Sequence, residues 1–281
     1  MYLARSEGWL DAQRVGLIEM SSGQDSLKAL AEGKVDGAAM TMDEVLQARA
    51  SGLPLSVVMI FDISAGADML VARPDIKTLA DLEGRRIGFE QGSVGELMLV
   101  ESLRAAGLTK EDVTLVMLSV AQQREAWSRD QVDAVVTYEP VGTQLLAQGA
   151  LNLFDSRQIP NTIVDVLAIR RDRLDRSHVR AIRHLIVAHF RALKHLNRNP
   201  QDAAYRMAPH LGLPAANFLS AFKGLTLPDA AHNYRLLAGT SPELLISTRK
   251  LSAIMVKSGL LKQDDPLATL IRVDFLPTDF Q

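Results

Sequence analysis

Short runs of β-branched and apolar residues alternate with amphipathic stretches over roughly the first 170 residues. This alternation is typical of an α/β protein with a largely parallel sheet. The expected strands are Arg14–Glu19, Gly37–Met40, Leu55–Phe61, Ala67–Ala72, Arg86–Glu90, Thr114–Leu118, Ala134–Thr137 and Thr162–Ile169. The expected helices between them are Ser22–Glu32, Met42–Ser51, Val94–Ala106, Ala121–Arg129 and Val141–Gly149.

After about residue 170 the strand patterns stop and the chain is predicted to be helical. Ser177 is the expected cap of a long helix, whose apolar positions recur every three or four residues. Asn199-Pro200 is expected to end this helix, and later prolines divide the rest into shorter ones.

Two extended segments, Ala67–Arg73 and Thr162–Arg170, enclose a self-contained set of three strands and three helices at about residues 86–150. An insertion entered and left through two extended segments indicates a hinged molecule with two lobes. The predicted division places residues 1–70 and 170–281 in lobe I and residues 71–169 in lobe II.

Composition excludes several classes of protein. The 31 basic and 33 acidic residues give a net charge of −2, so nothing favours a nucleic-acid partner. The absence of cysteine excludes disulfides, cysteine-ligated metals and thiol nucleophiles. No apolar run reaches the length of a membrane span, and Arg5 and Glu7 interrupt the amino-terminal turns where an export signal would be apolar.

The sequence shows none of the strong catalytic or nucleotide-binding motifs, so no cofactor is expected. Gly92-Ser93-Val94-Gly95 lacks the lysine and the spacing of a phosphate-binding loop. Four of the six histidines fall on the long helix, but their spacing does not suit a metal pair. A basic surface helix with one core histidine, His189, is the preferred interpretation, and no metal site is predicted.

Polar clusters follow several predicted strands and open the next helices. Ligands of open parallel sheets bind beyond the carboxyl ends of strands, where helix N-termini direct free N–H groups outward. Ser22, Thr41, Asp43 and Ser93 are also good N-cap residues, each worth about 1 kcal/mol, so capping alone is the alternative. Four clusters divided between two lobes favour a shared cleft: Ser21–Asp25, Thr41–Glu44, Glu90–Ser93 and Thr137–Pro140.

Acidic residues lie at or beside the same strand ends, and no Lys or Arg occurs among them. Solvated loop acids are the alternative explanation. If several face the cleft, a neutral, hydrogen-bonding or cationic ligand fits better than sulfate or phosphate. The acids are Asp62, Asp68, Glu90, Glu139 and Asp165.

At these residues the chain resembles the type II periplasmic solute-binding proteins of ABC importers, in the branch for nitrate, aliphatic sulfonates, taurine and thiamine-precursor pyrimidines. The resemblance covers roughly residues 2–170 and is more specific for the family than for the ligand. Its matching segments are Tyr2–Leu10, Ser26–Ala38, Thr41–Leu46, Ser64–Asp68, Leu79–Gly88, Gln91–Ser93, Val132–Pro140 and Ile159–Leu167.

The resemblance implies two α/β lobes joined by two crossover strands, with a small polar solute captured between them and no catalysis. Tyr138 would stack on a flat ligand while Glu139 accepts its N–H groups, although hinge packing is the alternative role for Tyr138. Carried over by position, the contacts are Ser22, Gly23, Thr41, Asp43, Gly66, Asp68, Gln91, Ser93, Tyr138, Glu139 and Asp165.

The resemblance also implies a periplasmic or lipid-anchored monomer that delivers its solute to an ABC permease and ATPase. Members of this family begin with an export signal, a first strand and a loop, and only then reach the helix that matches Tyr2–Leu10. Met1 stands where that strand should have ended. Either the sequence is shortened at its amino end, or the chain lacks a central strand of its first sheet. The second case exposes unpaired strand edges and leaves a weak binder or one that a partner completes. We expect an upstream extension to restore affinity and raise thermal stability.

Two other functions stay open at this stage. A relative on this fold acts as a pyrimidine-forming enzyme of thiamine biosynthesis. The chain is also compatible with a ligand-sensing domain of a regulator.

Overall fold

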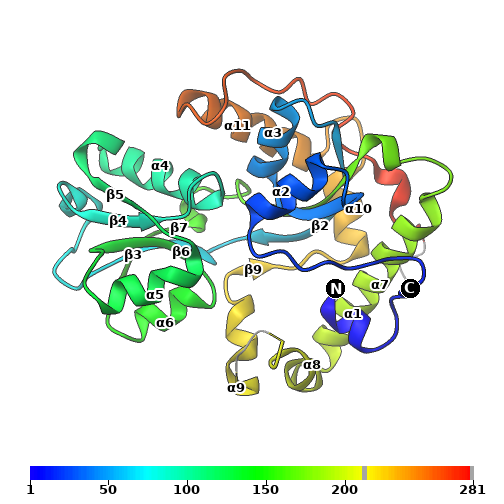
Figure 1. Cartoon of the computed structure of the whole chain (residues 1–281), viewed down its shortest axis with the longest axis horizontal. Coiled ribbons are helices and arrows are strands. Elements are labelled where there is room, and N and C mark those ends of the chain that lie inside the picture. Colours follow the sequence, from blue (N-terminus) through cyan, green and yellow to red (C-terminus); the bar gives the residue numbers. More distant parts are fainter. Residues whose placement is uncertain (211–213, 279–281) are drawn as a thin grey trace. The chain divides into compact units, whose positions relative to one another are not determined.

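The computed structural model describes residues 1–210 and 214–278 (Figure 1). The chain divides into two compact units of mixed α/β structure. Unit 1 comprises Met1–Ile63, Val164–Leu219 and Leu227–Gln281, and unit 2 comprises Ser64–Ile163 and Ser220–Thr226. The predicted boundaries between the lobes, at residues 70/71 and 169/170, lie six or seven residues after the boundaries between the units, at 63/64 and 163/164. The prediction also placed residues 220–226 in lobe I, whereas they belong to unit 2.

Three strands of unit 1 pair in the order β1-β8-β2. β8 lies antiparallel to both β1 and β2, so β1 and β2 run in the same direction. The middle of β2 is fully buried, from Val57 to Ile60. These strands are β1 (Gly37–Thr41), β2 (Leu55–Ser64) and β8 (Val164–Arg170). The short β9 (Leu225–Thr226) falls in the segment Ser220–Thr226 of unit 2.

Helices surround this sheet. α2 and α3 pack against β1, α11 packs against α3 and α10, and the long α7 packs against α1 and α8. A cluster of buried apolar residues, including Leu3, Leu10 and Ala188, joins α1 to α7 and α8. The helices are α1 (Tyr2–Ser6), α2 (Gly23–Ala31), α3 (Met42–Ala50), α7 (Val179–Arg198), α8 (Pro200–Met207), α9 (Ala215–Phe218), α10 (Ala230–Leu237) and α11 (Glu243–Lys257).

Unit 2 is built on a sheet of order β5-β4-β6-β3-β7. β4 lies parallel to β5 and β6, whereas β3 is antiparallel to β6 and β7. Its core includes Val71, Trp127, Val135 and Leu145. The elements are β3 (Asp68–Ala72), β4 (Arg86–Phe89), α4 (Val94–Ala106), β5 (Thr114–Met117), α5 (Val120–Ser128), β6 (Ala134–Tyr138), α6 (Val141–Leu146) and β7 (Leu151–Asp155).

Most elements expected from the hydrophobic pattern are confirmed to within a few residues, including the three strands and three helices of residues 86–150. The strand predicted at Arg14–Glu19 is wrong, because Arg14 lies in a turn and residues 15–20 are extended but pair with no described strand. β7 was not predicted. The expectation that strands stop after residue 170 is also wrong, since the short β9 follows.

The carboxyl-terminal part is helical as expected, and α7 ends at Asn199 before Pro200. His178, not Ser177, is the N-cap position of α7, because the Asp175 carboxylate accepts the N–H groups of both Ser177 and His178. Among the described residues no helix has both the length and the apolar character needed to cross a membrane.

The histidines of α7 differ in environment. His189 packs edge-on against Phe61 with ring centroids 5.0 Å apart, and burial lowers its pKa to about 3. His195, nearer the helix end, pairs with Asp202 at 2.7 Å and is partly exposed. His189 is thus the core histidine that the sequence predicted, and no group of described residues could hold a metal ion.

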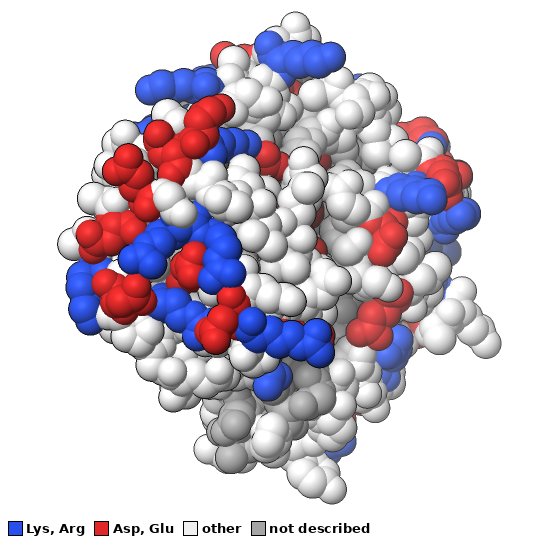
Figure 2. Space-filling view, turned by 60° about the vertical axis from the view of Figure 1, so that its left-hand side comes forward, with Lys and Arg blue, Asp and Glu red and all other residues white. Residues whose placement is uncertain are grey.

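Basic and acidic side chains are interspersed on the face shown in Figure 2, with no broad area of one sign. This mixture agrees with the small net charge of −2. The face in view therefore shows no broad basic area of the kind that binds a polyanion.

One buried ion pair ties the carboxyl-terminal segment to the sheet of unit 1. The Arg49 guanidinium donates to both oxygens of Asp265, at 2.7 and 2.9 Å, and to the carbonyl oxygen of Leu55 at 2.8 Å. Both side chains are less than 10% exposed, at 9% and 7%. Nearby, Ile271 forms a bridge with Val57 of β2. Because each charge is desolvated, removing one partner leaves the other uncompensated.

We therefore predict that Asp265→Ala lowers the free energy of unfolding of unit 1 by about 3–5 kcal/mol. Urea denaturation followed by circular dichroism measures the loss. The control is Asp274→Ala, which breaks an exposed pair with Arg272 and should cost less than about 1 kcal/mol. Equal losses for the two variants would contradict the assignment of a buried, stabilising pair.

Candidate functional site

Three polar residues lie side by side at one end of the sheet of unit 1. Thr41, the last residue of β1, is the register partner of Asp165 on β8, and Asp62 of β2 is the register partner of the same Asp165. α3 begins directly after Thr41, so its first N–H groups lie at this end of the sheet. The structure thus brings together two of the predicted contacts, Thr41 and Asp165, and adds Asp62.

Asp43 occupies the first turn of α3 and is only 2% exposed. Burial raises the pKa of its carboxyl group, although hydrogen bonds near the helix start oppose this effect. Within the described part of the chain, its Oδ2 atom is buried without a hydrogen-bond partner. A buried acid with an unpartnered oxygen and a raised pKa is a typical candidate for a ligand contact.

Glu44 connects the starts of α2 and α3. Its Oε2 atom accepts the backbone N–H of Thr41 at 3.1 Å. A Cβ atom built on Gly23 would lie 2.1 Å from Oε1 of Glu44, so any larger residue there would displace the Glu44 carboxylate. Ser22 caps α2, its hydroxyl oxygen accepting the N–H of Asp25. The Glu44 carboxylate therefore lies next to both Gly23 and Thr41, whereas the Ser22 side chain caps α2.

A second group of polar residues lies at one end of the sheet of unit 2. Asp68 of β3 and Tyr138 of β6 are register partners, and Glu90 directly follows β4. These three residues and Thr137 line a small cavity of about 10 Å³. A cavity of that size holds at most one water molecule, so it cannot enclose a larger solute.

Ser93 links Glu90 to the start of α4. Its hydroxyl accepts the N–H of Gly95 at 3.2 Å and donates to the carbonyl oxygen of Glu90 at 3.2 Å. Burial raises the pKa of the Glu90 carboxyl group, while the Ser93 hydroxyl opposes the effect. Gly95 is needed at this position, since a Cβ atom there would meet the Glu90 backbone at 3.0 Å.

The other predicted contacts of unit 2 are engaged elsewhere or solvent-exposed. Both carboxylate oxygens of Glu139 accept hydrogen bonds from Thr143, at 3.0 and 2.8 Å, which ties Glu139 to α6. The N–H of Gly66 donates to the Ser156 hydroxyl at 2.6 Å. Gln91 is exposed. Tyr138 is 39% exposed, so its ring presents a face to solvent.

Two residues escaped the sequence-based selection of contacts. Glu44 is 6% exposed, and its carboxylate lies next to Gly23. The spacing Thr41-x-x-Glu44 is that of a capping box, and this pattern could have identified Glu44 from the sequence. Thr137 is 2% exposed, and its hydroxyl oxygen has no hydrogen-bond partner among the described residues. Thr137 opens the polar cluster Thr137–Pro140 that the sequence predicted at the end of a strand, but only Tyr138 and Glu139 of that cluster were selected as contacts.

Comparisons with known proteins agree with this architecture. An aliphatic sulfonates-binding protein of Escherichia coli (strain K12), as it is named, is 29% identical over 159 residues, covering 54% of this chain and 50% of that protein. A protein named for thiamine biosynthesis in Haemophilus influenzae is 28% identical over 137 residues, covering 48% of this chain and 43% of that protein.

The fold is shared with a solved structure, the alkanesulfonate-binding protein SsuA from Xanthomonas axonopodis pv. citri bound to MOPS. The two superpose with a TM-score of 0.79 at 22% identity, covering 96% of this chain and 93% of the other. This likeness establishes the periplasmic-binding-protein fold that the sequence predicted.

The chain spans about half the length of the curated relatives it matches. The model of the NMT1/THI5-like family matches residues 1–203, which is most of the chain. The protein therefore belongs to the NMT1/THI5-like family.

Proposed function

We propose that this protein is the solute-binding component of an ABC importer and that it captures a small polar molecule without changing it. The observation that carries the proposal is the recurrence of one arrangement in both units. In each unit, a sheet ends in polar side chains beside the start of a helix: Thr41 and Asp43 at α3, and Ser93 at α4. The relatives named for sulfonate binding support this function.

The two kinds of group at these edges favour a solute that carries both an anionic group and a hydrogen-bond donor. Helix N-termini attract anions, since their first N–H groups are free and the helix dipole is positive there. The carboxyl groups of Asp43, Asp68 and Glu90 attract donors or cations. The sequence alone favoured a neutral or cationic ligand. The helix starts add the anion-binding element, and an aminoalkanesulfonate such as taurine satisfies both.

A thermal-shift screen tests the proposal. The panel consists of taurine, ethanesulfonate, ethylammonium, nitrate, MOPS and a thiamine-precursor pyrimidine. We expect saturable stabilisation by one chemical class, with taurine ahead of ethanesulfonate and ethylammonium because each of these lacks one of the two groups. Stabilisation by none of the six compounds would contradict a binding function for the chain.

The named thiamine-biosynthesis relative makes a catalytic function the second candidate. The same samples discriminate the two functions. After long incubation, recovery of the stabilising compound unchanged by mass spectrometry supports binding alone, and stoichiometric conversion supports an enzyme.

The proposal includes an extracytoplasmic location and delivery to a permease and its ATPase. A solved structure of the same fold, from Escherichia coli, is described as a periplasmic aliphatic sulphonate binding protein, which supports the location. It also includes action as a monomer. Pull-down with the permease encoded nearest to the gene, in the presence and absence of solute, tests the partnership.

A substitution at Ser93 distinguishes a ligand contact from a role in helix capping alone. We predict that Ser93→Ala weakens binding of the stabilising solute about tenfold, which corresponds to the loss of about one hydrogen bond. It should also lower stability by about 1 kcal/mol through the lost cap. The control is Thr78→Ala, which removes the N-cap of the short 3₁₀ helix Leu79–Leu82, which precedes β4 in the chain. Calorimetric titration should show unchanged affinity for this control, and equal losses in both variants would contradict a contact at Ser93.

We predict that the charged carboxylate of Asp43 destabilises the folded protein and contributes to solute binding. Its pKa is raised by burial, so the charged form at neutral pH is unfavourable in the folded state, and the cost disappears as the pH falls below the ordinary carboxyl range. Asp43→Asn should therefore raise the free energy of unfolding at pH 7 by on the order of 1 kcal/mol and weaken solute binding. The stability difference should narrow as the pH falls toward 3.

The control is Asp81→Asn, because hydrogen bonds from Thr78 lower the pKa of Asp81. This variant should lose stability at pH 7 instead of gaining it. Urea unfolding at several pH values shows whether each variant raises or lowers the free energy of unfolding. A lower free energy of unfolding for Asp43→Asn at pH 7 would refute the role given to Asp43.

A further inference from the structure

The outer face of α7 carries a row of basic side chains. At about 100° per residue, six positions of this helix fall within about 80° of one another. All six are exposed, and five of them are Lys or Arg. The row is about 27 Å long at about 1.5 Å per residue. We call it the basic stripe, and its members are Arg180, Arg183, Val187, Arg191, Lys194 and Arg198.

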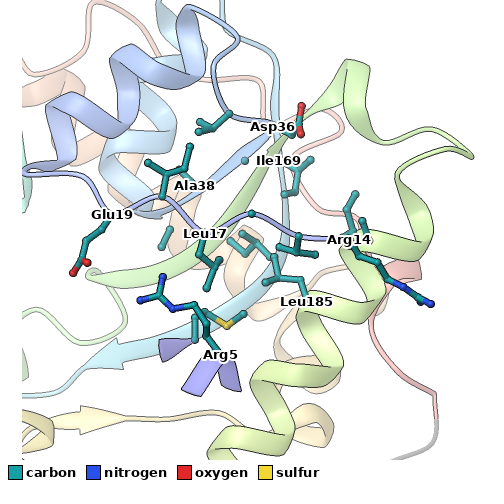
Figure 3. Close-up of a pocket in the computed structure, with 18 of the residues that line it drawn as sticks. Arg5, Arg14, Leu17, Glu19, Asp36, Ala38, Ile169 and Leu185 are labelled. Atoms are coloured by element: carbon teal, nitrogen blue, oxygen red, sulfur yellow. The ribbon is translucent and has the colours of Figure 1, made fainter. Parts of the chain in front are cut away.

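The opposite face of α7 belongs to the interior of unit 1. Ile182, Ile186 and Leu193 are buried there. Leu185 lines a cavity of about 550 Å³, together with residues 14–19 and 34–39 among others (Figure 3). No member of the basic stripe is among the described residues that line this cavity. The packing of the apolar face therefore holds the basic stripe toward the outside of the protein.

The sequence around the basic stripe supplies no acidic partner. From Arg176 to Gln201 the chain contains six Lys or Arg and no Asp or Glu. The carboxylates that flank this stretch are already engaged. Asp175 accepts N–H groups before the start of α7, and Asp202 pairs with His195 at 2.7 Å.

Contacts across the fold do not neutralise the basic stripe either. Arg183 donates to the backbone carbonyl oxygen of Asp274 at 2.9 Å, whereas the Asp274 carboxylate pairs with Arg272. The guanidinium carbon of Arg191 lies 4.4 Å from the ring centroid of Trp9, a contact that leaves the charge in place. The other three basic members make no ion pair with residues 1–210 or 214–278: Arg180, Lys194 and Arg198.

This arrangement is unfavourable in the protein alone. Like charges three or four residues apart on a helix repel one another and destabilise it slightly. An anionic surface placed against the row reverses this effect, because each basic side chain then gains a partner. The basic stripe therefore has the character of an interaction surface for an anionic partner.

We propose that the basic stripe is the surface through which unit 1 contacts an anionic lipid bilayer. Basic residues clustered on one face of an amphipathic helix favour anionic membrane surfaces, and lipids diffuse laterally to meet each side chain. Val187, at the centre of the row and 51% exposed, suits the apolar boundary beneath the headgroups. Since the apolar face of α7 stays packed in the protein, the contact is electrostatic and reversible.

A bilayer suits the basic stripe better than other anions do. A small anion needs convergent donors, whereas these side chains leave successive helical turns over about 27 Å. A long polyanion meets a chain whose net charge is −2 even with the stripe included. The setting rests on the proposed function, because a protein that delivers a solute to a permease acts beside a membrane.

Flotation with lipid vesicles tests the proposal. Vesicles of phosphatidylcholine alone are compared with vesicles that contain about 30% phosphatidylglycerol. We expect binding to the anionic vesicles alone in about 50 mM salt, and at least tenfold weaker binding in about 500 mM salt, because salt screens the charges. Absence of binding to the anionic vesicles, or equal binding to both kinds, would overturn the proposal.

The stripe variant removes the three charges that make no ion pair with described residues, through Arg180→Gln, Lys194→Gln and Arg198→Gln. Each Lys or Arg near an anionic surface strengthens binding about fivefold, so the variant should bind about a hundredfold more weakly. Its melting temperature should stay within about 2 °C of the unchanged chain, since the substituted side chains are exposed.

A matched control removes three exposed basic residues of α10 and α11, through Arg235→Gln, Arg249→Gln and Lys250→Gln. This control has the same net charge as the stripe variant and should lose less than about fivefold in binding. Equal losses for the two triple variants would assign the effect to net charge and overturn the proposal.

A gain of binding provides the second test, because a misfolded variant does not produce it. Val187→Lys completes the row and should strengthen binding to the anionic vesicles about fivefold. The control is Ile246→Lys on α11, which replaces a side chain of similar exposure, 45%, and should change binding less than about twofold. An equal gain for both variants, or a gain for neither, would contradict the proposal.

A short DNA duplex separates a lipid surface from polyanions in general. Duplex binding as tight as vesicle binding at the same salt concentration would assign the basic stripe to polyanions and overturn the proposal. None of these readouts involves a solute, so their failure is distinct from a failure of the proposed function.

Discussion

The pairing of β8 with both β1 and β2 is the interaction on which the rest of unit 1 depends. This strand returns from unit 2 and lies antiparallel between two strands that run together. Its register fixes Thr41, Asp165 and Asp62 in one row at the end of the sheet. One strand therefore positions the candidate contacts of unit 1.

Two of the candidate contacts are carboxyl groups whose charged forms are unfavourable in the folded protein. Asp43 and Glu90 each have a pKa raised by burial, so their environments disfavour the charge they carry at neutral pH. Core residues such as Val57 and Leu70 meet no such conflict and are fully buried. For Asp43, whose Oδ2 atom is buried without a hydrogen-bond partner among the described residues, a bound donor would supply the missing hydrogen bond. This difference distinguishes Asp43 and Glu90 from Glu139, whose oxygens are already satisfied by Thr143.

The sequence predicted the fold class and most elements, because hydrophobic period and capping residues act locally. It predicted a strand at Arg14–Glu19 that does not pair, since alternation reports which side chains are buried and not whether a neighbour completes the ladder. Leu151–Asp155 was missed because the strand is short and only its end is buried. The clusters at Thr41 and Ser93 were identifiable from strand ends. The support from Glu44 depends on a contact with Gly23 that the sequence does not encode locally.

The proposed function depends on solute contacts at the helix starts beside the sheet edges. Hydrogen exchange with and without a saturating concentration of the stabilising compound measures these contacts most directly. We expect slower exchange at the first-turn amides of α3, around Asp43, or of α4, around Gly95, with β7 unchanged. Unchanged exchange at both helix starts would contradict the proposed function.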